Sequence, residues 1–270
     1  MAKKRFFIYL FAMISLVLLT VVNANAQQAG QIQTMRWKVG DTTREAMVYI
    51  PAGANSKPTP VIFVFHGHGG TMRNMFNAHG FEKLWPEAII IAPQGLNTPG
   101  QLTDPQGNLP GWQKAPGDMR DRDILFFDAI LKTLRQDYKV DDKRIYATGH
   151  SNGGGFTYLL WAMRGDVFAA VAPSAAVGFR FSNLLKPKPA MHIMGEQDPL
   201  VKPKWQKIQY NQVLKLNGCS ATGEVYAPMA TLYPSASGNP VVLYIHPGGH
   251  VYPQEANAVV IRFFKSMVKP

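Results

Sequence analysis

Residues 145–154, Ile-Tyr-Ala-Thr-Gly-His-Ser-Asn-Gly-Gly, decide the fold of this chain. The first four residues favour a β-strand, Gly149 to Gly153 form the pattern Gly-x-Ser-x-Gly, and a helical segment follows. A strand, a sharp turn and a helix in this order are typical of a nucleophile elbow, which holds a serine hydroxyl exposed at the edge of a sheet. Gly149 and Gly153 suit such an elbow because residues without a side chain let neighbouring elements approach closely.

The same five-residue pattern also occurs by chance in glycine-rich turns that carry a surface serine. The context favours a nucleophile for Ser151, because a predicted strand precedes it and a predicted helix begins directly after it. The free amides and the dipole of that helix N-terminus stabilise negative charge that develops beside the serine.

Short apolar runs of strand length alternate with helical segments on both sides of this motif. We predict strands at 35–39, 46–50, 61–65, 88–92, 145–148, 169–172, 190–194 and 241–245. We predict helices at 121–137, 152–163, 204–216 and 255–267. Most of the strands lack alternating polarity, which suits a sheet covered on both faces. The pattern predicts an α/β fold with a mostly parallel central sheet, helices on both faces, and ligand-binding loops at the carboxyl ends of the strands.

A serine nucleophile needs a base that takes its proton and, ordinarily, a carboxylate that holds the base, in the chain order serine, acid, histidine. Two acids, Glu196 and Asp198, lie just beyond the predicted strand 190–194. Asp198 is favoured because it falls in the loop proper and Pro199 helps to fix the turn. The alternative for Asp198 is a solvated loop carboxylate.

The candidate base is His250, which follows the predicted strand 241–245 and a Pro-Gly-Gly segment. The glycines give a loop in which an imidazole can face the sheet edge. His246 is expected to pack at the end of the strand, and His192, inside a predicted strand, is expected to be a core residue.

Acyl transfer also needs two backbone amides aimed at the oxyanion, and the loss of one such donor typically costs about 10²–10³ in turnover. The amide of Asn152 is one candidate. The second is the amide of His68, within the His-Gly-His-Gly-Gly loop at 66–70. A zinc site at His66 and His68 is the alternative, but no third ligand is evident, so we predict neither a metal nor a cofactor.

The segment 94–117 is rich in Gly, Pro, Asn and Gln, and we predict a long functional loop. Its isolated Trp112 either plugs a hydrophobic gap or forms an aromatic wall for the substrate. Asp121 and Asp123, at the start of a predicted helix, are expected to cap that helix.

The N-terminal segment is typical of a secretory signal peptide. Lys3, Lys4 and Arg5 precede an apolar run from Phe6 to Val22, and small residues end the segment at Ala26. A membrane anchor is the alternative, because the run is almost long enough to span a bilayer. We expect residues 1–26 to be removed, and residues 27–270 to form a single catalytic domain that is secreted or periplasmic.

Composition limits the other classes of function. The formal net charge is +11, of which residues 27–270 carry +8, but Lys and Arg occur singly or in short groups. A solvated basic surface that aids contact with anionic polymers is therefore favoured over a nucleic-acid groove. Cys219 is the only cysteine, so no intramolecular disulfide can form after export.

Several of these motifs occur together in one order. They are 65–70 (Phe-His-Gly-His-Gly-Gly), 93–96 (Pro-Gln-Gly-Leu), 149–154 (Gly-His-Ser-Asn-Gly-Gly), 198–199 (Asp-Pro) and 248–250 (Gly-Gly-His). In this the chain resembles, over nearly all of residues 27–270, the α/β-hydrolase esterases related to polyhydroxybutyrate depolymerases and to feruloyl and acetylxylan esterases of carbohydrate esterase family one. The resemblance implies that Ser151, Asp198 and His250 form the triad and that Trp112 matches a tryptophan near the active site.

The chain also departs from that family. Relatives commonly have Asp-Asp-Val where this chain has Asp121-Arg122-Asp123-Ile124, and they often carry a cysteine in the oxyanion loop, where His68 stands here. They also often have a disulfide near Gly218-Cys219, and Cys219 lacks a partner. Substrate preference therefore does not transfer with the motifs.

These residues predict a serine esterase that forms an acyl-enzyme, with a feruloyl or acetyl ester on plant cell-wall polysaccharide as the leading substrate class. The first alternative is hydrolysis of a polyester such as polyhydroxybutyrate or its oligomers. A serine peptidase is the second, since its fold and triad can be identical, and an exported binding protein on a non-catalytic hydrolase scaffold is the third.

Overall fold

The computed structural model describes residues 30–100 and 102–270, and Gln31–Pro270 form one compact unit. The predicted signal peptide at residues 1–26, with its alternative as a membrane anchor, lies outside the described residues. Within the described part of the chain, no helix is long and apolar enough to cross a membrane.

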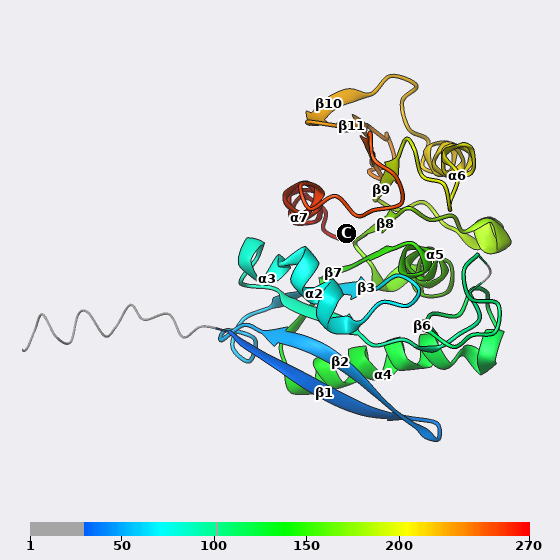
Figure 1. Cartoon of the computed structure of the whole chain (residues 1–270). Helices are drawn as coiled ribbons and strands as arrows, with labels where there is room; N and C mark the ends of the chain where they lie inside the picture. Colours follow the sequence, from blue (N-terminus) through cyan, green and yellow to red (C-terminus); the bar gives the residue numbers. More distant parts are fainter. Residues whose placement is uncertain (1–29, 101) are drawn as a thin grey trace, which may run out of the picture. The chain divides into compact units, whose positions relative to one another are not determined.

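The unit is built on a ten-stranded sheet in the order β1-β2-β4-β3-β7-β8-β9-β12-β11-β10 (Figure 1). The strands are β1 (Gln31–Val39), β2 (Thr42–Ile50), β3 (Thr59–Phe65), β4 (Ile89–Pro93), β7 (Val140–His150), β8 (Ala170–Ser174), β9 (Ala190–Gly195), β10 (Glu224–Ala227), β11 (Ala230–Tyr233) and β12 (Val241–His246). Strands β4, β3, β7, β8, β9 and β12 pair in parallel. Antiparallel strands close both edges, so the predicted mostly parallel sheet is confirmed.

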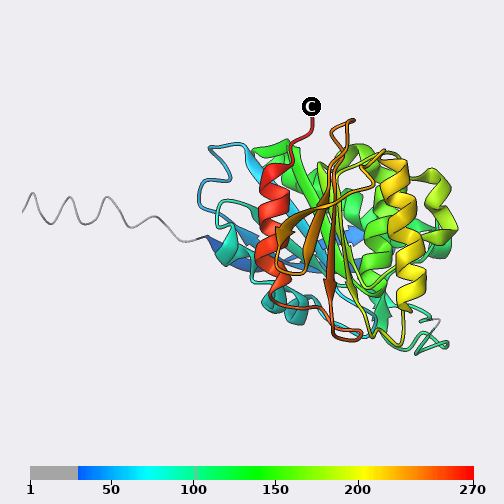
Figure 2. The same cartoon turned by 90° about the horizontal axis from the view of Figure 1, so that it is seen from above.

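Helices cover both faces of the sheet, as the buried β3 shows most simply. Val61, Phe63 and Phe65 point into one hydrophobic core, whereas Ile62 and Val64 point into the other. The first core is completed by α4 (Arg122–Asp137), α5 (Asn152–Arg164) and α6 (Pro203–Leu216), and the second by α2 (Met72–His79), α3 (Phe81–Leu84) and α7 (Ala256–Ser266). Figure 2 shows α7 and α6 on opposite sides of the sheet.

Every strand and helix predicted from the sequence is present, with its ends shifted by a few residues. Strand β7 already begins at Val140, because Thr59 of β3 pairs with that residue. The prediction missed helix α2, although Thr71 accepts a bond from the amide of Asn74 at its start and Gly80, with φ 54°, ends it. It also missed the short strands β10 and β11, which have four residues each and are mostly part-exposed or exposed.

The parallel register brings the carboxyl ends of five strands to one edge. Phe65 pairs with Gly149, His150 with Ser174, and His246 with Gly195. The loops that follow β3, β7, β9 and β12 therefore emerge together, and these loops carry every predicted site residue except Trp112. The segment 94–117 contributes a small ribbon, β5 (Leu96–Asn97) with β6 (Pro110–Gly111), to the same edge.

Candidate active site

Ser151 lies at the sharp turn between β7 and α5 and has a positive φ of 56°. Such a backbone costs on the order of 1–3 kcal/mol for a residue with a side chain, and the surroundings must hold it. The amide of Ser151 donates to Ser174 O at 2.8 Å, and the amide of Gly155 donates to Ser151 O at 2.9 Å. A Cβ on Gly149 would lie 2.5 Å from Gly153 O, and one on Gly153 would collide with Phe65 O, so both positions require glycine.

The Ser151 hydroxyl is hydrogen-bonded to a histidine, and that histidine to a carboxylate. The distance from Ser151 Oγ to His250 Nε2 is 2.7 Å, and the distance from His250 Nδ1 to Asp198 Oδ2 is 2.8 Å. With Nδ1–H donating to the carboxylate, Nε2 is left as the acceptor for the serine proton. This arrangement allows proton transfer from the serine to the imidazole.

Asp198 is 2% exposed and accepts from four donors. The amides of Leu200 and Val201 both lie 2.9 Å from Oδ1, while Gln206 Nε2 lies 3.1 Å from Oδ2, beside the His250 ring. Donors on both oxygens fix the plane of the carboxylate. The competing acid, Glu196, is exposed.

Behind Gln206 the hydrogen bonds continue into the core. His192 Nε2 lies 3.2 Å from Gln206 Oε1, and Tyr158 Oη lies 2.8 Å from His192 Nδ1. Burial lowers the pKa of His192 to about 4, so its ring is neutral near pH 7. Because Gln206 donates its amide nitrogen to Asp198, its oxygen must accept from His192, which leaves Nδ1 to accept from Tyr158. The donors in this series of hydrogen bonds, Tyr158 Oη, His192 Nε2 and Gln206 Nε2, therefore all donate in the direction of Asp198.

The two other histidines considered near the base lie elsewhere. His246 is 5% exposed at the end of β12, where its Nδ1 accepts from the amide of Gly248 at 3.2 Å. His192 belongs to the buried chain described above. His150 lies beside His250, with a ring separation of 4.9 Å, and burial together with the charge of His250 lowers its pKa to about 4. The neighbour of the base is thus a neutral imidazole.

The loop after β3 lies directly against the elbow. A Cβ placed on Gly67 would be 3.5 Å from Ser151 Cβ. His66, 1% exposed, pins this loop because its Nε2 accepts from the amide of Gly95 at 2.9 Å and its Nδ1 lies 2.7 Å from Gly67 O. Among the described residues, no acceptor is assigned to the backbone amides of His68 and Asn152. Two free amides thus flank the serine.

The side chains of His68 and Asn152 tie the 94–117 segment to these amides. His68 Nε2 lies 3.0 Å from Asp104 Oδ2, and Asp104 also accepts from the amides of Asn108 and Leu109. Asn152 accepts from the amide of Trp112 at 2.6 Å through Oδ1. The ring nitrogens of His66 and His68 are therefore hydrogen-bonded to different partners. Within the described residues, no group of three potential metal ligands occurs.

The expected substrate wall at Trp112 is wrong. Its side chain is 0% exposed and stacks on Phe156 with 5.1 Å between ring centres, while Phe65 meets it edge-on at 5.3 Å. Its Nε1 donates to His66 O at 2.8 Å. The indole fills the core under the loop that follows β3, because the 94–117 segment folds back on the sheet instead of leaving the ring at the surface. The other interpretation from the sequence, that Trp112 plugs a hydrophobic gap, describes the residue correctly.

Asp121 and Asp123 were also expected to cap helix α4, but no side-chain cap bond is present there. Asp123 is instead buried, where its Oδ1 accepts from Arg44 Nη2 at 2.9 Å and its Oδ2 from the amide of Gln113 at 2.8 Å. Asp121 accepts from Gln113 Nε2 and from the amide of Gly117, both at 2.8 Å. The two acids hold the end of the 94–117 segment.

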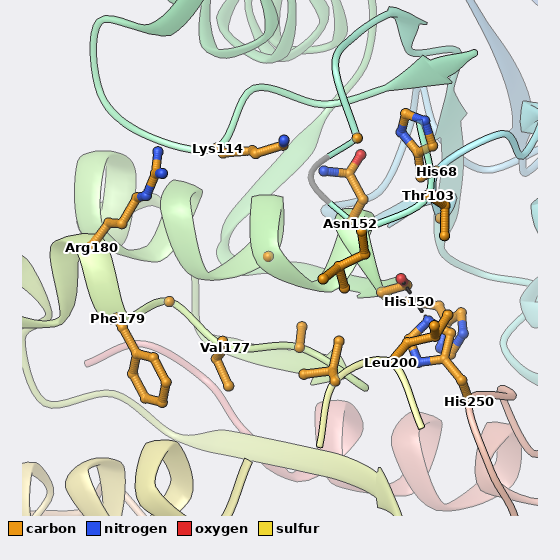
Figure 3. A pocket seen from close by; sticks show the side chains of 18 of the residues that line it. His68, Thr103, Lys114, His150, Asn152, Val177, Phe179, Arg180, Leu200 and His250 are labelled. Atoms are coloured by element: carbon orange, nitrogen blue, oxygen red, sulfur yellow. Dashed lines mark hydrogen bonds between the residues drawn. The ribbon is translucent and has the colours of Figure 1, made fainter. Parts of the chain in front are cut away.

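A cavity of about 540 Å³ opens over Ser151 (Figure 3). His250, His150 and His68 border it near the serine, and Lys114 and Arg180 lie at its other end. Its apolar lining is Leu102, Ala176, Val177, Phe179, Phe181, Leu200 and Val201. Sequence analysis missed all of these lining residues and both cations, because they come from separate loops that carry no motif.

Fold and site together define a serine hydrolase of the α/β-hydrolase class. Residues 116–179 match the prolyl oligopeptidase family. The chain is 31% identical over 248 residues to feruloyl esterase C of Emericella nidulans, a match that covers 85% of each protein. The chain therefore belongs to the feruloyl esterase family, and it is a carboxylic ester hydrolase.

Solved structures agree on the fold. An acetyl xylan esterase from Aspergillus awamori matches with a TM-score of 0.66 and 14% identity, over 86% of this chain and 99% of the other. A ferulic acid esterase matches with a TM-score of 0.62 and 17% identity, over 87% of this chain and 97% of the other. The resemblance to α/β-hydrolase esterases predicted from the sequence motifs is thereby confirmed.

Proposed function

We propose that the protein hydrolyses feruloyl-type esters on plant cell-wall polysaccharide, with Ser151, His250 and Asp198 as the catalytic triad. The observation that carries this proposal is the continuous series of hydrogen bonds from Ser151 through His250 to Asp198 at the base of a largely apolar cavity. A cavity of about 540 Å³ lies within the usual range for small-molecule sites, and Val177, Phe179 and Phe181 offer an apolar surface for an aromatic acyl group. The similarity to feruloyl esterase C of Emericella nidulans supports the same substrate class.

In the proposed mechanism, His250 Nε2 takes the proton of Ser151 as Oγ attacks the ester carbonyl. The amides of Asn152 and His68 donate to the oxyanion, and Asp198 holds the imidazolium through Nδ1–H. The tetrahedral intermediate then collapses, and the leaving alcohol takes the proton from Nε2. A water molecule, deprotonated by the same nitrogen, attacks the acyl-serine carbonyl; the bond to Ser151 Oγ then breaks, Oγ takes the proton back from Nε2, and the carboxylic acid is released.

Replacement of Ser151 by alanine tests this assignment directly. Loss of such a nucleophile costs about 10⁶ in turnover, so Ser151→Ala should leave only residual cleavage of methyl ferulate. The matched control is Ser220→Ala, which removes a surface hydroxyl from a turn and should keep full activity. Undiminished ester cleavage by purified Ser151→Ala would overturn the assignment.

The substrate class is tested with a panel of methyl ferulate, acetylated xylan, hydroxybutyrate oligomers and a peptide amide with a matched acyl group. The proposal expects the highest kcat/KM on the feruloyl ester. A higher kcat/KM on acetylated xylan or on hydroxybutyrate oligomers would reassign the substrate while the triad stands. Preference for the amide would make the protein a peptidase.

We also infer that residues 1–26 direct export, that residues 27–270 form the mature single catalytic domain, and that the enzyme is secreted or periplasmic. The charged start, apolar run and small-residue end of the segment support this proposal. The N-terminal sequence of protein recovered outside the cytoplasm tests it, with Gln27 as the expected first residue. Recovery of a chain that still begins at Met1 would instead support the membrane anchor.

A further inference from the structure

The cavity over Ser151 has an uneven distribution of charge. Its lining includes two basic side chains, Lys114 and Arg180, and among the described residues no aspartate or glutamate lines it. Figure 3 shows both cations at the end of the cavity away from His250. They come from different parts of the chain: Lys114 ends the 94–117 segment, and Arg180 lies in the short 3-10 helix Phe179–Leu184. Residues that share no local structure thus bring two positive charges to one place.

Neither Lys114 nor Arg180 forms an ion pair with a described side chain. Among the described side chains, no carboxylate lies within 4.0 Å of Lys114 Nζ or of the Arg180 guanidinium, and neither group donates an assigned hydrogen bond. The carboxylate of Asp118 accepts from the backbone amide of Lys114 at 3.2 Å and has no assigned bond to its ammonium group. Burial and then the charge of Arg180 lower the pKa of Lys114, and Asp118 opposes this only in part.

Lys114, which is partly buried, and Arg180 carry like charges at one end of the cavity, and an anion that binds both would stabilise them. Nearby residues Val177, Phe179 and Phe181 are apolar, and such surroundings suit one negative charge better than the several charges of a phosphate. A guanidinium and an ammonium can together satisfy both oxygens of a carboxylate. The local chemistry therefore selects a carboxylate.

We propose that Lys114 and Arg180 form a subsite for a carboxylate carried by the ester substrate, away from the bond that is cleaved. This inference rests on the proposed ester hydrolysis and narrows its substrate class to acidic esters. The carboxylate belongs either to the alcohol part, as in an acidic sugar or hydroxy acid, or to the acyl part, as in an aromatic acid with a second carboxyl group. Both sources offer the same group to the two cations.

Two matched pairs of substrates separate these sources. Feruloyl quinate and its methyl ester differ only in the charge of the alcohol part, and the methyl esters of 4-carboxycinnamate and of its 4-carboxamide differ only in the charge of the acyl part. The wild type should cleave the charged member of one pair with a kcat/KM about 10-fold higher, which is the size expected for a charge-assisted hydrogen bond. The difference should lie mainly in KM and should shrink as salt is added.

The variants are Lys114→Met, Arg180→Met and the double variant, with the surface pair Lys207→Met and Arg73→Met as a control of equal net charge. The double variant should lose the preference for the charged member of the pair, measured as the ratio of kcat/KM between the two members, whereas the surface pair should keep that ratio. Equal kcat/KM within both pairs in the wild type would overturn the subsite, as would a preference that survives in the double variant. Failure of the wild type to cleave even methyl ferulate would instead count against the proposed function.

Discussion

The two ends of the cavity over Ser151 are built in opposite ways. At the His250 end, the polar groups are buried and each hydrogen bond fixes the direction of the next, from Tyr158 through His192 and Gln206 to Asp198. At the Lys114 end, two basic side chains line the cavity without an ion-pair partner among the residues that the structure describes. The side chains that orient His250 have hydrogen-bond partners within the protein, because they must hold one geometry. Lys114 and Arg180 lack such partners among the described residues, which suits side chains that bind a substrate.

The largest expected effect is a loss of kcat on substitution at the His250 end of the cavity. Asp198→Asn should lower kcat on methyl ferulate by about 10⁴, because an amide in place of the carboxylate disturbs the tautomer that His250 needs. Glu196→Gln, two residues away and exposed, is the matched control and should change kcat little. An Asp198→Asn enzyme within 10-fold of wild type would show that the buried carboxylate does not orient the base.

The next largest expected effect is on the free energy of unfolding and concerns Trp112. Trp112→Ala removes a fully buried indole that packs on Phe65 and Phe156, and it should cost about 3–5 kcal/mol of unfolding free energy. Denaturant unfolding measures the loss. Trp205→Ala, at a part-exposed position on α6, provides the comparison and should cost much less. Equal losses would mean that Trp112 does not anchor the oxyanion loop.

A smaller effect tests the hydrogen bonds behind Asp198. Gln206→Met keeps the side-chain volume but removes the donor to Asp198 and the acceptor for His192. We expect kcat to fall about 10-fold or more, with KM nearly unchanged, since a hydrogen bond to a charged group contributes roughly 1.5–3 kcal/mol. The pH profile of kcat is the second readout, and it should change because the carboxylate has lost one of its donors. A loss of stability with unchanged kcat and pH profile would limit Gln206 to packing.

The smallest effect is a pH dependence of stability. Burial lowers the pKa of His79 to about 3, so between pH 6.5 and 3 the unfolded chain binds a proton there that the folded protein does not. Stability linked to this residue is therefore complete above pH 6.5 and falls on acidification, by about 1.4 kcal/mol per pH unit. His79→Phe should flatten the fall in Tm between pH 7 and pH 5. An identical fall in both proteins would place the acid sensitivity elsewhere.

Most of the framework followed from local sequence. Runs of β-branched and apolar residues have the length of buried strands, and the helices between them were found to within a few residues. Helix α2 carried its own signals in Thr71 and Gly80, which were overlooked. Strands β10 and β11 could not be found this way, because they are held by pairing with β12 and not by their own pattern.

The sequence by itself determined the order of serine, acid and histidine and the glycines around Ser151, because the elbow and the chain order are local or one-dimensional properties. Only the tertiary structure decided where each loop side chain points. It turned Trp112 into the core, aligned Gln206, His192 and Tyr158 behind Asp198, and brought Lys114 to the same cavity as Arg180. The physical reason is that these positions depend on contacts between segments far apart in the chain, and no periodicity within a segment records them.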